Sequence, residues 1–185
     1  CCTNCFRRDV VPDRLAAIER FNLVNDTWAT TLAGLTPLQD YIGLLELLRD
    51  ENDLNVWTTV LISCHQLDRI LDPAQRASLQ TCIRSVISPA VERLTWKPRG
   101  GETELESQLR GDLIGALGTV GEDKTCQRRA RALFAQYERD SGSVDRNLIP
   151  AVVAIVSHTG AGSDYENFVK RFKTGAMSYG SISKE

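Results

Sequence analysis

The fold class is decided by the stretch LQTCIRSVISPAVERL, which occupies residues 79–94. Its apolar side chains recur at intervals of three and four residues, so they share one face of an α-helix for about four turns. The members of this stripe are Leu79, Cys82, Ile83, Val86, Ile87, Ala90, Val91 and Leu94. The stretch therefore predicts a helix with one buried face.

Outward from this stretch, the same spacing recurs in residues 105–120, 126–137 and 165–176. The ends of the segments carry capping side chains, a Pro at a first helical position, or a Gly where a helix should stop. These signals are Thr36-Pro37, Asp72-Pro73, Thr103 with Glu106, Ser163 with Glu166, and Gly34, Gly121 and Gly160. They predict about eight helices, near 13–33, 37–50, 54–72, 73–95, 103–120, 123–140, 145–159 and 164–177.

Two segments, 57–62 and 152–156, are rich in β-branched residues and could be read as strands. Both continue into helical periodicity, so we favour helices there. A shift of 39 residues along the chain places the Leu-rich stripe and Gly stop of 109–121 on those of 148–160. This spacing suits a curved stack of antiparallel helix pairs, as in HEAT or armadillo superhelices.

The composition indicates an ordinary folded domain without a polyanionic partner. The chain has 185 residues, of which 42% are hydrophobic and 25% charged, and its net charge is −2. We therefore expect no nucleic-acid partner. No apolar run approaches the roughly 20 residues that a membrane span needs, so no membrane partner is expected either.

The six cysteines fall into two groups. Cys64, Cys82 and Cys126 are scattered, and the first two lie on apolar stripes, where reduced, buried thiols are expected. This favours a reducing compartment, and we expect a cytoplasmic location. Cys1, Cys2 and Cys5 crowd the N-terminus; Cys2-x-x-Cys5 could be half of a zinc or redox site, but no second pair follows.

Catalytic chemistry is scarce in this sequence. Only His65 and His158 could supply an imidazole, and neither belongs to an H-E-x-x-H motif. Cys64 and His65 are sequence neighbours, which on a helix do not face each other. The charged groups have structural explanations: a helix N-terminus for Glu102, Glu104 and Glu106, and a solvated helix face for Arg128, Arg129 and Arg131. We therefore expect no catalytic residue and no bound metal in this chain.

A family resemblance enters at residues 20–29, RFNLVNDTWA, where an Arg is followed six residues later by Asp and then by Trp and Ala. The next match is the Leu-rich segment 41–57, which ends in Glu51, Asp53 and Val56-Trp57. Together with Gln108-Leu109-Arg110 and Lys170-Arg171-Phe172-Lys173, these segments resemble the C-terminal helical domain of the aminopeptidase N and puromycin-sensitive aminopeptidase family of zinc metallopeptidases.

The resemblance implies a division of labour within a longer polypeptide. In such enzymes an upstream catalytic domain holds zinc through H-E-x-x-H and binds the free amine of the peptide through G-A-M-E-N. The C-terminal domain is a helical superhelix that covers the catalytic cleft and shapes the peptide chamber. The partners it implies are the catalytic domain of the same polypeptide and the peptide substrate, and the zinc belongs to the parent enzyme. The segment 175–178, GAMS, lacks the Glu of that motif.

The resemblance also implies the domain limits and one candidate site residue. We expect 1–11 to be an N-terminal tail and 12–185 to be the helical domain, apparently cut at its C-terminal end. Arg110 is the candidate for a contact with the peptide, because a guanidinium can grip a carboxylate through two hydrogen bonds. A structural ion pair of Arg110 is the other possibility. The alternative function is a free-standing, HEAT-like adaptor that binds another protein.

Overall fold

The structure of the chain is a computed structural model that describes residues 14–173, apart from the side chains of Ser163, Arg171 and Phe172. Within these residues the protein is all-helical, with eight α-helices and no strand, so the predicted fold class is confirmed. The helices are α1 (Ala17–Leu32), α2 (Leu38–Glu46), α3 (Leu54–Ile70), α4 (Pro73–Leu94), α5 (Glu104–Gly118), α6 (Lys124–Arg139), α7 (Ile149–Thr159) and α8 (Gly162–Lys173). Two 3-10 turns, η2 (Ser141–Ser143) and η3 (Arg146–Leu148), lie between α6 and α7.

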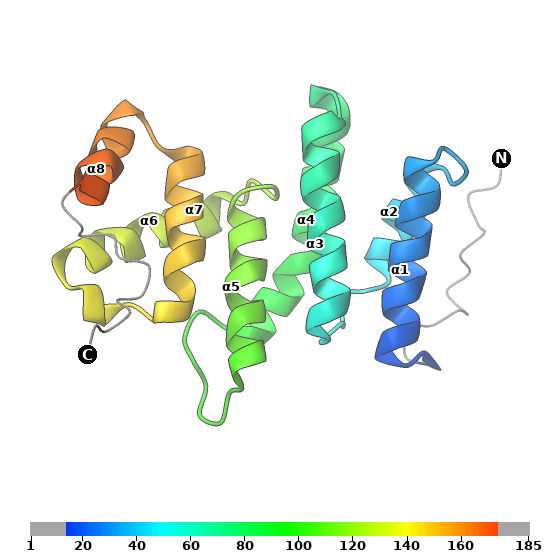
Figure 1. Ribbon diagram of the computed structural model, residues 1–185, viewed down its shortest axis with the longest axis horizontal. Helices are drawn as coiled ribbons and strands as arrows, with labels where there is room; N and C mark the ends of the chain where they lie inside the picture. Colours follow the sequence, from blue (N-terminus) through cyan, green and yellow to red (C-terminus); the bar gives the residue numbers. More distant parts are fainter. Residues whose placement is uncertain (1–13, 174–185) are drawn as a thin grey trace.

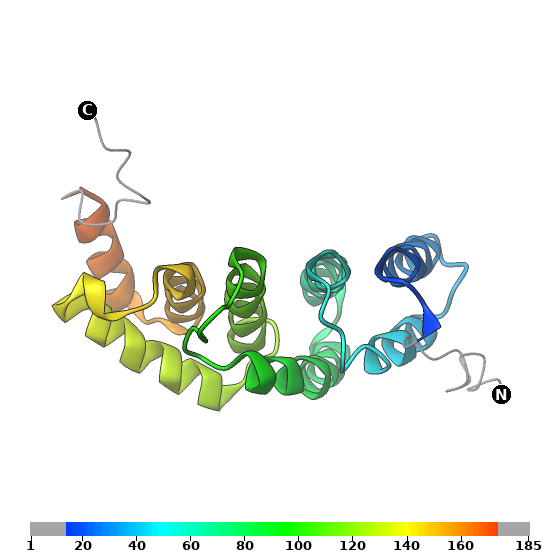
Figure 2. The same ribbon diagram turned by 90° about the horizontal axis from the view of Figure 1, so that it is seen from below.

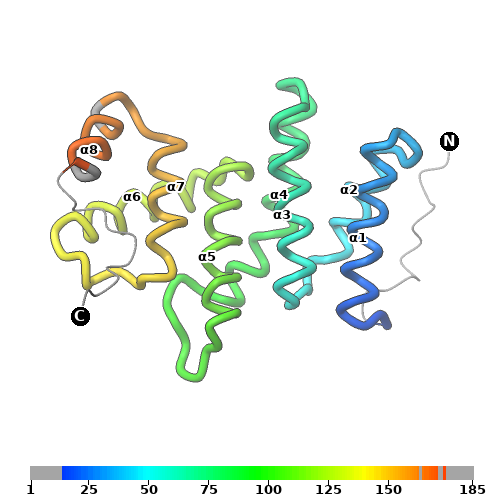
Figure 3. The backbone as a smooth tube through the Cα atoms, viewed as in Figure 1, coloured from blue at the N-terminus to red at the C-terminus, as the bar shows by residue number. Residues whose placement is uncertain are grey.

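The helices are arranged in two layers. Figure 2 shows α1, α3, α5 and α7 end-on in one row, with α2, α4 and α6 beneath them. In the first row, α1 packs on α3, α3 on α5 and α5 on α7 (Figure 1). The colours in Figure 3 show that these four helices stand side by side and that their chains all run in the same direction, upward in this view. The arrangement is a two-layer stack; the finer HEAT-like repeat stays a prediction.

The core follows the boundary between the two layers. One continuous cluster of buried side chains extends from α1 to α7 and includes Val24, Trp57, Ile83, Leu113 and Ile155. The stripe that predicted the fold class is entirely within this cluster, from Leu79 to Leu94. A smaller cluster of Phe134, Val152 and Val156 joins α6 to α7. We call α1, α3, α5 and α7 the odd-numbered row. A groove lies on the outer face of this row, along α3, α5 and α7.

Most of the sequence signals for helix ends are found where they were predicted. Thr103 and Glu106 form a reciprocal capping box at α5, and Asp72 and Gln75 form another at α4. Gly34 follows α1 with a φ of 73°, a conformation that Gly adopts without steric cost. Thr36 was wrong as a cap: its hydroxyl lies 2.8 Å from that of Thr30, and α2 begins after Pro37 without a side-chain cap.

Glycines let α5 and α7 approach each other closely. A Cβ added at Gly111 would lie 2.8 Å from the main-chain oxygen of Asn147, and one at Gly118 would lie 2.5 Å from the side chain of Ile155. A Cβ at Gly115 would only reach ordinary contact with Ala151, at 3.6 Å. Gly111 is therefore the position where a side chain would collide with backbone, which cannot turn away.

We expect Gly111→Ala to destabilise the chain. Overpacking costs about 1–3 kcal/mol, while Ala in place of Gly returns roughly 1 kcal/mol of helix propensity, so a net loss of about 0–2 kcal/mol is expected in place of the gain that Ala brings at an open site. Gly43→Ala in α2 is the matched control, because nothing lies within 4 Å of its added Cβ. The control should gain about 0.5–1 kcal/mol in urea unfolding. An equal gain in both variants would contradict the close approach.

Candidate functional site

An open groove of about 1080 Å³ lies on the outer face of the row formed by α1, α3, α5 and α7. Its walls come from α3, α5, η3 and α7. The α5 wall presents Glu104, Gln108, Asp112 and Thr119, which are spaced so that they share one helix face. From Glu104 to Thr119 the helix rises roughly 22 Å, which is the length of about six residues of extended peptide. The groove is therefore long enough for a segment of chain.

Small side chains form much of the groove. Gly111, Gly115 and Ala116 of α5 line it beside Pro150, Ala151 and Ala154 of α7, where the two helices pack closely. The α3 wall contributes larger groups, among them Ile62, which is 52% exposed. A groove with small residues on its walls leaves room for a polypeptide backbone, and exposed Ile62 offers an apolar contact.

One end of the groove is fixed by the ion-pair network of Arg110. The Arg110 side chain is fully buried on α5 and forms ion pairs with Glu102 and with Asp145, the latter at 2.5 Å. Its guanidinium also donates to the hydroxyl of Ser107 at 2.9 Å, and that hydroxyl accepts a second hydrogen bond, 2.7 Å long, from Asn147. Since Asn147 lines the groove, the network holds η3 against α5.

Arg110 itself has no accessible surface, so the arrangement is the structural ion pair that the sequence left open. Peptide contact by Arg110 stays a prediction, and nothing in this geometry favours it. The partners were not foreseen: Glu102 lies eight residues before Arg110 and Asp145 thirty-five residues after it. Glu102 had been assigned to the helix N-terminus, and only Glu104 and Glu106 lie in the first turn of α5.

The other end of the groove carries a side-chain contact between α7 and the turn that follows α5. Nε2 of His158, near the end of α7, lies 2.6 Å from Glu122 in the turn between α5 and α6. Burial alone would raise the pKa of Glu122, but hydrogen bonds from Lys124, Gln127 and His158 outweigh it and hold the pKa at about 2. His158 was expected to suit the end of its helix; the structure adds this partner.

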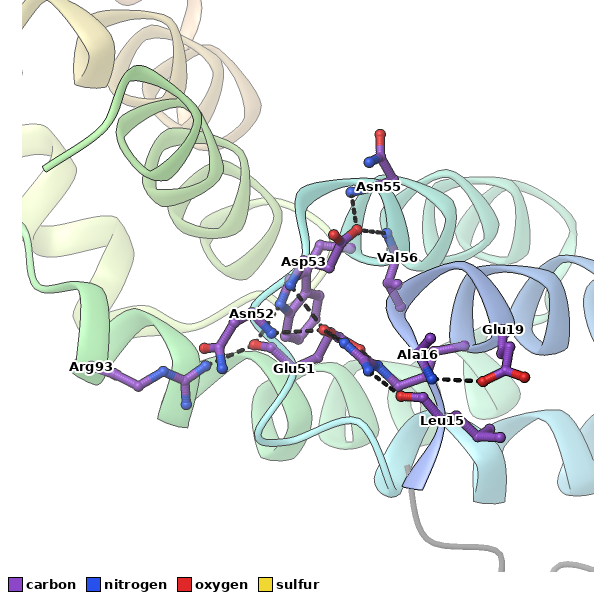
Figure 4. A network of polar contacts seen from close by, with 11 residues as sticks. Leu15, Ala16, Glu19, Glu51, Asn52, Asp53, Asn55, Val56 and Arg93 are labelled. Carbon is purple, nitrogen blue, oxygen red and sulfur yellow. Dashed lines mark hydrogen bonds and ion pairs between the residues drawn. The ribbon is translucent and has the colours of Figure 1, made fainter. Parts of the chain in front are cut away.

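A second network lies outside the groove and joins α1, α3 and α4 (Figure 4). Arg20 of α1 donates to both carboxylate oxygens of Glu51, at 2.6 and 2.8 Å, while that carboxylate also accepts from the main-chain amides of Asn52 and Asp53. The main-chain oxygen of Glu51 accepts from Arg93 of α4 at 2.8 Å. Arg20, which carries the family resemblance, is therefore a structural residue here.

The candidate nucleophiles have no catalytic arrangement. Burial raises the pKa of Cys64 to about 12, that of Cys82 to about 11 and that of Cys126 to about 12, so these thiols stay protonated near neutral pH. All three are free and buried, and burial was predicted for Cys64 and Cys82. Cys1, Cys2 and Cys5 lie outside the described residues, as does the segment 175–178.

The described residues contain no group of three or more His, Cys, Asp or Glu side chains that could hold a metal ion. In the same part of the chain, no helix is long and apolar enough to cross a membrane.

Of the basic run of Arg128, Arg129 and Arg131, Arg129 stacks on the ring of Trp96 at 4.7 Å and Arg131 pairs with Asp164 at 3.1 Å. These contacts give the run structural roles between neighbouring elements.

Comparison with known proteins identifies one family model and several distant relatives that cover most of the chain. Residues 6–180 match the model of a family described as the ERAP1-like C-terminal domain. Aminopeptidase M1-A of Oryza sativa subsp. japonica is 24% identical over 175 residues, which cover 90% of this chain and 20% of the relative. Aminopeptidase M1 of Arabidopsis thaliana is 25% identical over 86% of the chain, and glutamyl aminopeptidase of Mus musculus 26% over 73%. The chain thus spans about a fifth of the length of the plant relatives.

Proposed function

Because this chain belongs to the family of ERAP1-like C-terminal domains, we propose that it is the non-catalytic C-terminal domain of a zinc aminopeptidase. In this proposal the helical array covers the catalytic cleft of the same polypeptide, and its groove lines the chamber in which the peptide lies. The parent enzyme would remove N-terminal residues from peptides. The observation that carries the proposal is the groove along α3, α5 and α7, whose length and small-residue walls suit an extended chain.

The zinc of the proposed parent would be held outside this chain. The described residues do not fit the metal, because they offer no group of three protein ligands such as a catalytic zinc requires. This chain's contribution would be to bind and orient the peptide, since binding energy from parts remote from the reacting bond can lower the barrier to its cleavage. A cytoplasmic location is also proposed, and it rests on the three free, buried cysteines.

The division of labour can be tested by comparing the complete polypeptide with this chain alone. The complete polypeptide should contain zinc by elemental analysis and should release N-terminal residues from peptides, with loss of activity on chelation. The isolated 185-residue chain should do neither. Zinc binding or peptide hydrolysis by the isolated chain would refute a non-catalytic domain. A complete polypeptide without a metal site or peptidase activity would instead support the free-standing adaptor.

A further inference from the structure

Some ionisable side chains of the groove have a charged or hydrogen-bonding partner, and others have none among the described residues. Asp68 is paired with Arg76 at 3.4 Å, and His158 with Glu122. Burial lowers the pKa of His65, although nearby Asp68 opposes that effect, so this imidazole is mainly neutral at pH 7. Within residues 14–173, the groove's remaining charged groups form no ion pair; they are Glu104, Asp112 and Arg146.

Asp112 occupies the central position among these groups. It lies midway along α5, on the face shared by Gln108 and Thr119, and forms no hydrogen bond or ion pair with another described residue. The side chain of Asp112 is exposed in the groove, and partial loss of water there raises the pKa of its carboxyl. A positively charged ligand group would favour the charged form of this carboxylate and so compensate for the lost water.

We propose that the groove selects peptides with a basic side chain in their interior, and that Asp112 pairs with this basic side chain. This inference rests on the proposed function. The two unpaired carboxylates, Glu104 and Asp112, outnumber the one unpaired guanidinium, Arg146, so the groove is complementary to a cation. A lysine or arginine side chain is long enough to reach Asp112 from a backbone lying along the small-residue walls. Arg146 opposes this preference by like-charge repulsion.

The test compares peptides cleaved by the complete polypeptide. The substrates are a neutral peptide of about ten residues, long enough to fill the groove, and a series in which a single Lys replaces Gln at successive interior positions. For at least one position, Lys should raise kcat/KM about twofold to fivefold, as expected for a solvent-exposed charge pair. Asp112→Asn should abolish this preference, whereas Arg146→Gln should increase it.

Two further variants make the outcomes distinguishable. Asp26→Asn removes an exposed carboxylate of α1 outside the groove, and it should leave the preference for Lys unchanged. Ala154→Trp fills the groove and should impair cleavage of neutral and basic peptides alike. If Ala154→Trp impairs cleavage but Asp112→Asn keeps the preference for Lys, the charge inference is overturned and the proposed function stands. If Ala154→Trp affects no peptide, both are overturned.

Discussion

Arg110→Ala is expected to lower the free energy of unfolding of the chain by about 3–5 kcal/mol, because it leaves two carboxylates without their cation in a buried site. The side chains of Arg110, Glu102 and Asp145 are only 0%, 6% and 17% exposed, so water can compensate little of that loss. The hydroxyl of Ser107 would also lose one of its two donors. Urea unfolding of the isolated chain measures the effect.

Two comparisons separate the buried network from a general effect of losing an Arg. Arg128→Ala removes an exposed guanidinium of α6, which donates to the hydroxyl of Thr125 one turn away, and should change stability by less than about 0.5 kcal/mol. Neutralising the whole site, with Arg110→Met, Glu102→Gln and Asp145→Asn together, should recover much of the loss. Equal stability of Arg110→Ala and the unchanged chain would show that the ion pairs are not formed.

Glu51→Ala is expected to cost about 3 kcal/mol, because one carboxylate accepts four hydrogen bonds from three residues between α1 and the start of α3. Its side chain is 1% exposed, and it accepts from Arg20 and from the amides of Asn52 and Asp53. The substitution leaves the Arg20 guanidinium, which is 20% exposed, partly buried and unpaired from Glu51. Asp50→Ala is the control, since Asp50 is an exposed neighbour of the same loop.

The same carboxylate makes stability depend on pH in a defined direction. Burial would raise the pKa of Glu51, but the hydrogen bonds from Arg20, Asp53 and Asn52 outweigh it and hold the pKa below the ordinary value of 4.5. Such a group stabilises the fold above its unfolded pKa, and the stabilisation is lost as pH falls through the lower folded pKa. Between pH 7 and pH 3 the unchanged chain should therefore lose more stability than Glu51→Gln does. Parallel pH profiles would contradict this assignment.

Helices were predictable from this sequence because their signals are local. The stripe from Leu79 to Leu94 needs only its own spacing to indicate a buried face, and Asp72 with Gln75 needs only three residues to form a cap. Even the β-branched segment 57–62 became helix, because Trp57, Val60 and Leu61 fall on the buried face of α3. Thr36 shows the limit: its hydroxyl had a competing partner in Thr30, which the local pattern does not reveal.

The groove and its supporting networks depend on contacts between distant residues. Arg110 was a candidate from the sequence, but its partner Asp145 directly precedes η3, which approaches α5 where Gly111 leaves room for the main-chain oxygen of Asn147. Likewise, Asp112 gives no sequence signal of its own, since its significance lies in having no partner within a groove built from three helices. The Gly111, Gly115 and Gly118 spacing was the one local sign of close helix packing at this place.

The central claim is that the groove lines the peptide chamber of an aminopeptidase, and blocking the groove tests it most directly. In the complete polypeptide, Ala154→Trp would place a large ring in the groove, and Ala132→Trp would place one on exposed α6 outside it. The account predicts that Ala154→Trp lowers kcat/KM for a long peptide by about tenfold or more, while a single-residue amide substrate is cleaved within about twofold of the unchanged rate. Ala132→Trp should affect neither substrate. An unchanged rate for the long peptide with Ala154→Trp, or an equal loss for both substrates, would contradict the account.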